Sequence, residues 1–163
     1  MSNNIDYFLP IEALYTMLST DTNISTRNSL TTKFYKILDI EEVLTDLARQ
    51  GFEQFRQFLN PVICISSHNN ISFIQDLNNV FTADKVEPNL IIDCLYNDYD
   101  LTKAKKEALY LAEDIRQKII NDKCLNNSVY TSRVKAIESL GYLNYDECPF
   151  NYAFRIHLEV TFR

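Results

Sequence analysis

The chain has 163 residues, a formal net charge of -6, and hydrophobic and charged fractions of 46% and 23%, which are ordinary values for a globular protein. This length favours one domain spanning residues 1–163, with a single packed core. The chain has only two glycines, Gly51 and Gly141, so a glycine-rich loop that cradles phosphates is excluded, together with the nucleotide-binding enzymes that depend on one. The acidic balance also argues against broad binding to a nucleic-acid backbone.

The four cysteines are widely spaced and form no C-x-x-C pair. Cys64 and Cys94 lie within apolar runs typical of strands, so we interpret the cysteines as reduced thiols that pack like small hydrophobic residues. The chain has two histidines and no cluster of suitable ligand spacing, and we therefore expect no metal site. The opening residues carry no basic presequence and no apolar run approaches ~18 residues, so we expect neither an export signal nor a membrane span.

In chain order, the first helix is predicted at residues 10–20, where Pro10 suits the first turn and apolar residues recur at helical spacing. The polar stretch STDTNISTRNS at 19–29 is typical of a loop. The following 31 residues, from Leu30 to Asn60, give a mixed signal. Within them, 41–60 gathers its apolar residues along one side and predicts a second helix, interrupted at a glycine.

The middle of the chain predicts two strands and the clearest helix. After Pro61, the apolar run VICISS predicts a strand buried on both faces. Residues 68–88 have no clear period, and we interpret them as a long connection that has space for a short strand. The run NLIIDCLYND at 89–98 predicts the next strand. Asp100 then stands at the N-cap position of a helix at 101–123, which has one apolar stripe and an opposite charged face interpreted as solvated.

The last third predicts a strand around 129–137, a turn-rich segment containing Gly141 and Pro149, and a final strand at 151–163. That final segment, NYAFRIHLEVTFR, has apolar residues on every second position, the period-2 signature of a strand with one buried face. The sequence thus predicts a single-domain α+β fold. Its mixed or antiparallel sheet is expected to pack against the long helix and the N-terminal helices.

No motif in the sequence supports catalysis. His68 follows ISS, but adjacent serine and histidine residues rarely have the geometry of a nucleophile and its base. His157 lies on the polar side of the last strand, where we expect a surface or interface position. The carboxylates of DIEEVLTD at 39–46 lack the spacing of a calcium loop and are interpreted as acids that favour a helix N-terminus. We therefore predict no catalytic residue, no cofactor and no enzyme activity.

The order of these segments resembles the tail-terminator and tail-completion proteins of tailed bacteriophages. The resemblance covers roughly residues 10–163 and is best from Pro88 onward. An opening helix precedes NPVICIS, PNLIIDCLYND leads into AKKEALYLAEDIRQKI, and a short strand and a turn precede the alternating YAFRIHLEVTFR. This resemblance implies a small α+β virion protein without catalysis, located in the tail or neck and assembled in the host cytoplasm.

The resemblance further implies a homo-oligomeric ring, commonly a hexamer, that caps the tail tube and joins it to the head connector. DNA would pass through the lumen without specific binding, and an acidic subunit suits such a passage. In a ring, one subunit contacts the next through two different surfaces. The polar half of the last strand is our candidate for one of them, through Arg155, His157, Glu159 and Arg163.

Three alternatives remain open on the sequence. The first is another neck or head-tail connector component. The second is a small cytosolic ligand-binding or enzymatic domain that uses residues 68–88 as a lid, which predicts a concave pocket with titratable groups of perturbed pKa. The third is a bacterial adaptor or regulatory protein without a phage connection.

Overall fold

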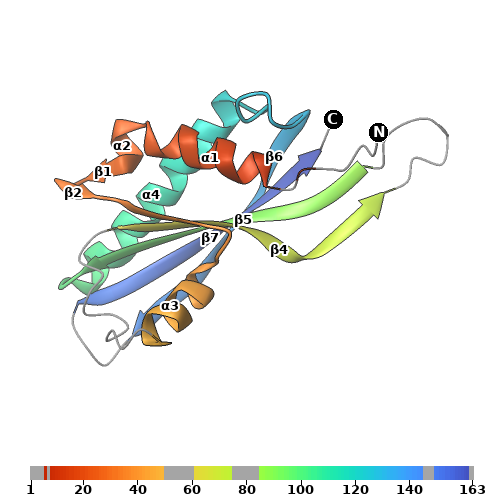
Figure 1. Cartoon of the computed structure of the whole chain (residues 1–163). Coiled ribbons are helices and arrows are strands. Elements are labelled where there is room, and N and C mark those ends of the chain that lie inside the picture. The colour runs from red at the N-terminus through yellow and green to blue at the C-terminus, as the bar shows by residue number, and fades with distance from the viewer. Residues whose placement is uncertain (1–5, 7, 50–60, 75–84, 145–148, 162–163) are drawn as a thin grey trace.

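The computed structural model describes residues 6, 8–49, 61–74, 85–144 and 149–161. These residues form an α+β fold in which one five-stranded sheet carries helices on both faces (Figure 1), as predicted. The helices in this part of the chain are α1 (Leu9–Ser19), α2 (Thr22–Ser25), α3 (Ile40–Arg49) and α4 (Leu101–Asn121). The strands are β1 (Thr26–Arg27), β2 (Leu30–Thr31), β3 (Lys33–Lys36), β4 (Val62–Ile74), β5 (Lys85–Asp98), β6 (Thr131–Asn144) and β7 (Phe150–Thr161).

The large sheet has the strand order β3-β4-β5-β7-β6. β3 runs parallel to β4, and every other neighbouring pair is antiparallel. β1 and β2 form a separate two-stranded ribbon. Because α4 connects β5 to β6, the chain crosses over the place that β7 then fills. The last strand is therefore an inner strand of the sheet.

The main core lies between the sheet and the pair α1 and α4. The buried side of α4 is the predicted apolar stripe, which consists of Ala104, Ala108, Leu111, Ala112, Ile115 and Ile119. Leu101, which the pattern placed in the same stripe, is 42% exposed in the first helical turn. Asp100 caps this helix as predicted, since its Oδ1 accepts hydrogen bonds from the backbone N–H groups of Thr102 and Lys103 at 2.9 and 3.1 Å.

A second, smaller core lies on the other face of the sheet, beneath α3. Ile40 and Val43 of α3 pack there with Val62 and Cys64 of β4 and with Leu95 of β5. Since α1 packs against the first face of β4, the VICISS strand is buried on both faces, which confirms that prediction. Of the predicted helix at 41–60, the part up to residue 49 is helical and the remainder lies outside the described residues.

The polar stretch at 19–29 differs from the loop that was predicted, because local side-chain hydrogen bonds and turn residues give it regular structure. This stretch is no simple loop, because it holds α2 and the start of the β1–β2 ribbon. The side chain of Asp21 accepts from the N–H of Asn23 at 2.9 Å and so begins the short helix. Asn28 and Ser29 have φ values of 51° and 64°, which is the left-handed backbone that a tight hairpin turn requires.

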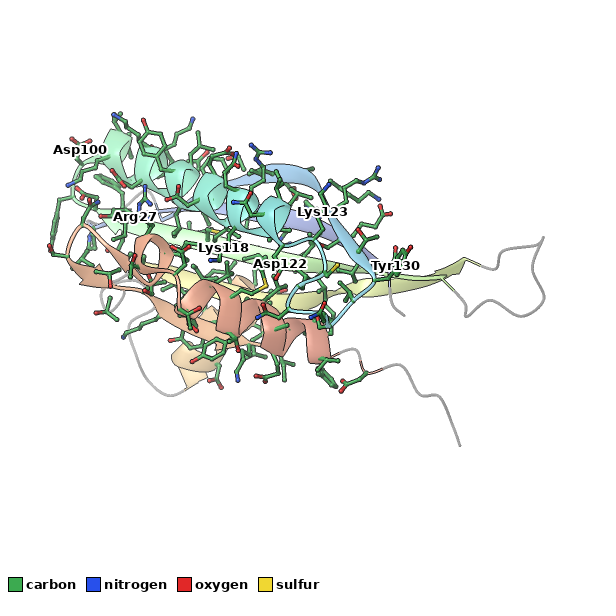
Figure 2. All side chains as sticks on the ribbon, turned by 90° about the horizontal axis from the view of Figure 1, so that it is seen from above. Arg27, Asp100, Lys118, Asp122, Lys123 and Tyr130 are labelled. Carbon is green, nitrogen blue, oxygen red and sulfur yellow. The ribbon has the colours of Figure 1, made fainter. Side chains whose placement is uncertain are left out.

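The ribbon also changes the interpretation of the charged face of α4. Arg27 reaches from β1 to that helix (Figure 2) and pairs with Glu107 at 2.9 Å and Asp114 at 2.7 Å. Lys118 of the same helix lies 3.4 Å from the carboxylate of Asp21. Part of the face interpreted as solvated is therefore covered by the segment that precedes β3.

The strands differ from the sequence-based prediction in three further respects. β3 was not predicted at all. Of the predicted connection at 68–88, residues 68–74 and 85–88 continue β4 and β5, which are antiparallel, and residues 75–84 lie outside the described residues. β6 runs well beyond the predicted end of its strand at residue 137 and includes Gly141, which has φ 82° and lies at one of three register shifts between β6 and β7. Bulges of this kind are common in edge strands such as β6.

The burial of two thiols gives a first prediction. Burial raises the pKa of the Cys64 and Cys94 thiols well above the usual value, and the carboxylate of Asp93 raises both further. In a Cys124→Ser/Cys148→Ser variant, these two thiols should react with a disulfide reagent at pH 8 no faster than the protein unfolds. Reaction with Ellman's reagent measures this rate. A rapid reaction of one or both thiols in the folded variant would contradict this prediction, because it would show that the reagent reaches the two strands.

Candidate interaction surface

The residues of β7 alternate between the two faces of the sheet, as the sequence predicted. Arg155, His157 and Glu159 lie on the face that α3 partly covers, and we call them the polar row. Arg163, the fourth predicted interface residue, lies outside the described residues. Because β7 lies between β5 and β6, the polar row meets two neighbouring strands. The apolar row is buried on the opposite face and consists of Tyr152, Phe154, Ile156, Leu158 and Val160.

The first member of the polar row is held within the subunit. Arg155 stands opposite Asp93 of β5, whose side chain has no exposed surface. Its Nε donates to Oδ1 of Asp93 at 2.7 Å and its Nη2 donates to Oδ2 at 3.0 Å. These hydrogen bonds raise the pKa of Arg155, although burial opposes the shift. The guanidinium therefore neutralises a buried carboxylate, and its side chain is only 16% exposed.

The same carboxylate positions α3. Oδ2 of Asp93 also accepts a hydrogen bond from the backbone N–H of Ile40, at 3.0 Å, in the first turn of this helix. Asp39 and Glu42 complete a capping box, because Glu42 N donates to Asp39 Oδ1 at 2.8 Å and Asp39 N donates to Glu42 Oε1 at 3.3 Å. These two acids thus have the helix-start role that the sequence predicted for the group at 39–46.

The outer members of the polar row form pairs with β6 that face solvent. Nε2 of His157 lies 2.8 Å from Oε2 of Glu138, and their side chains are 27% and 54% exposed. Glu159 lies 3.1 Å from Arg133 and 3.4 Å from Lys135. Exposed pairs of this kind contribute little to folding, and a partner that offers the opposite charges can exchange with them at low cost.

The structure therefore divides the predicted interface residues. Arg155 serves the fold, whereas His157 and Glu159 lie where another molecule can reach them. Sequence reasoning missed Asp93, although the signal was present in IIDCLY: a carboxylate inside an apolar strand requires a partner. The sequence did not show which residue is that partner, because Arg155 is 62 residues away along the chain.

A second surface feature is the far end of the β4–β5 hairpin. β5 pairs with β7 only from Asn89 onward, and β3 pairs with β4 only over 62–65. Within the described part of the chain, residues 71–74 and 85–88 therefore pair with each other and with no further strand, and we call these two segments the arm. Figure 1 shows the arm projecting beyond the helices. A two-stranded ribbon of this kind is marginally stable on its own in water, so packing against another surface would favour it.

No family model matches the chain, and no curated protein matches it either. Among the described residues, no helix is both long enough and apolar enough to cross a membrane. In the same part of the chain, no three histidine, cysteine, aspartate or glutamate side chains are grouped so that they could hold a metal ion.

The buried pair predicts strong energetic coupling between Asp93 and Arg155. Replacing either residue alone, as Asp93→Leu or Arg155→Met, leaves an uncompensated charge in a mostly buried site. Each change should lower the free energy of unfolding by about 3–5 kcal/mol. The double variant should lose much less than the sum of the two. Urea denaturation followed by circular dichroism measures all three values.

An exposed pair provides the matched control for this cycle. Nζ of Lys103 lies 3.4 Å from Asp98, and the Lys103 side chain is 51% exposed. Lys103→Met should leave the midpoint of urea denaturation nearly unchanged, because an exposed ion pair contributes little to stability. Additive losses at Asp93 and Arg155, or single losses no larger than this control, would show that the buried pair does not organise the fold.

Proposed function

We propose that this chain is a structural protein of a tailed-phage virion that forms a ring. The ring caps the tail tube and joins it to the head connector, with DNA passing through its lumen. The proposal starts from the resemblance in segment order to tail-terminator and tail-completion proteins. The arrangement of the described surfaces supports it further.

The observation that carries the proposal is the arm. Its two segments, 71–74 and 85–88, extend the paired strands β4 and β5 beyond Asn89, the last residue of β5 that pairs with the described part of β7. In a closed ring, each subunit needs a projecting surface and a receiving surface that differ from each other. The arm is the projecting surface in our proposal, and the next copy of the chain receives it.

The polar row gives the ring a second type of contact. His157, Glu159 and their partners on β6 place charges of both signs on one exposed strip of the sheet. Such a strip fixes orientation between neighbours through charge complementarity more than it adds affinity. Arg155 has no part in this contact, because Asp93 already binds its guanidinium.

The charge of the subunit fits a DNA passage. Because each subunit has a net charge of -6, a ring of these subunits would repel the phosphate backbone over most of its surface. A lumen of this sign lets DNA slide without being held, whereas a basic lumen would bind it. The proposal thus includes no specific contact with DNA and no catalytic step.

Assembly in solution tests the proposal. The purified chain at tens of micromolar should give one discrete species by light scattering coupled to size exclusion. Its mass should be a whole multiple of the 19.1 kDa subunit, sixfold for the proposed hexamer. Replacing residues 71–88 with a short Asn-Gly turn should yield a folded monomer, because it removes the arm and leaves the five-stranded sheet.

A second variant separates the two contacts. His157→Gln/Glu159→Gln keeps Arg155 and Asp93 intact, so it should leave the fold unchanged, as judged by circular dichroism. We expect it to weaken the oligomer about tenfold without abolishing it, as for the loss of contacts at an interface rim. A wild-type chain that stays monomeric at these concentrations contradicts the proposal. An arm deletion that assembles as wild type contradicts the role of the arm.

A further inference from the structure

A cavity of about 560 Å³ lies between the C-terminal end of α4 and the paired ends of β6 and β7. Its volume is within the range of small-molecule sites in proteins. The arm does not line it, but Glu159 of the polar row and its partner Arg133 do. Figure 2 shows its surroundings, with Lys123 just after α4 and Tyr130 just before β6.

Positive charge collects at this cavity, although the chain as a whole is acidic. Among the described residues, the ammonium group of Lys123 has no hydrogen bond or ion pair. Arg133 and Lys135 share one carboxylate, that of Glu159, so this group carries one positive charge in excess. The Arg133 side chain is 72% exposed, so its ion pair with Glu159 can open toward a ligand at low cost.

The remaining cation of the lining is already neutralised. Arg116 binds both carboxylate oxygens of Glu113, at 2.8 and 2.5 Å, and this contact lowers the pKa of Glu113 to about 2. The net charge available to a ligand therefore comes from Lys123 and from the Arg133 group. The C-terminal end of a helix carries a partial negative charge of about half an elementary charge, which these two positive charges outweigh.

The rest of the lining is suited to a compact organic molecule. Ile119, Ile120 and Val134 provide apolar surface, and Ile120 is 40% exposed. Thr131 and Thr161 are register partners, so their side chains lie on the same face at one end of the cavity. Hydroxyl groups and cations beside apolar side chains are the usual lining of a site that binds an anionic head with an apolar body.

We propose that this cavity binds a small organic anion, with one phosphate or carboxylate group facing Lys123 and Arg133 and a compact apolar body against Ile119 and Ile120. Its lining lies outside the arm but includes Glu159 and Arg133, so the site shares residues with the polar strip and none with the arm. The proposal assigns a ligand-binding role to the end of α4 and no chemical step.

Titrations monitored by ¹H–¹⁵N NMR test this site. Phenyl phosphate should bind with a dissociation constant of about 1 mM or below, and benzoate should shift the same resonances. Inorganic phosphate should bind more weakly than phenyl phosphate, because it lacks the apolar body. Lys123→Gln and Arg133→Gln should each weaken phenyl phosphate about fivefold, as for the loss of one charged contact in a partly exposed site. Ile120→Gln should reduce the preference for phenyl phosphate over inorganic phosphate.

The control is Lys106→Gln, an exposed lysine in the first half of α4 that does not line the cavity. At constant ionic strength, it should leave the affinity for phenyl phosphate unchanged. Equal weakening by Lys106→Gln and Lys123→Gln would overturn the proposal, because the anion would then sense only the net charge. Equal affinities for phenyl phosphate and inorganic phosphate would also overturn it. Since no outcome depends on oligomer mass, the ring proposal is tested separately.

Discussion

The carboxylate of Asp93 is the constraint on which the second face of the sheet depends. A charge with no exposed surface costs several kcal/mol unless partners surround it, and here Arg155 and the N–H of Ile40 do so. These contacts join β5, β7 and α3, three elements that are distant in the chain. The position of α3, and with it the small core around Val43, follows from satisfying one acid. On the opposite face, the core cluster consists of aliphatic, aromatic and sulfur-containing side chains, and the described residues place no charged group in it.

The sequence predicted the elements whose pattern is long and regular, such as α4 with its Asp100 cap and β7 with its alternation. It failed where the structure depends on pairing between distant segments. β3 has four residues and exists because β4 offers a parallel neighbour. β4 continues through the polar residues of SHNNIS, at 67–72, which have little strand preference of their own, and pairing with β5 on either side of a register shift supports the strand there. Likewise, the alternation in the sequence identified the residues of the polar row. It did not show that Arg155 is held within the subunit whereas His157 faces solvent.

The described surface thus separates into parts with different physical roles. Arg155 is committed to the fold. In our proposals, the outer polar row and the arm contact a neighbouring subunit, and the cavity beside Lys123 binds a small anion. The arm and the anion site use different residues, whereas Glu159 and Arg133 belong both to the polar strip and to the lining of the cavity. The described part of residues 68–88, for which a lid was one alternative, belongs to strands β4 and β5, and it does not line the cavity at the end of α4.

Because every functional statement about assembly depends on whether copies of this chain close into a ring, imaging of the purified protein is the deciding measurement. Negative-stain electron microscopy with two-dimensional class averaging should show uniform closed particles with a central hole, with six-fold symmetry in the proposed hexamer. Compact single particles of the size of one 19.1 kDa subunit, in a sample that is folded and concentrated before dilution, would contradict a ring-forming virion protein.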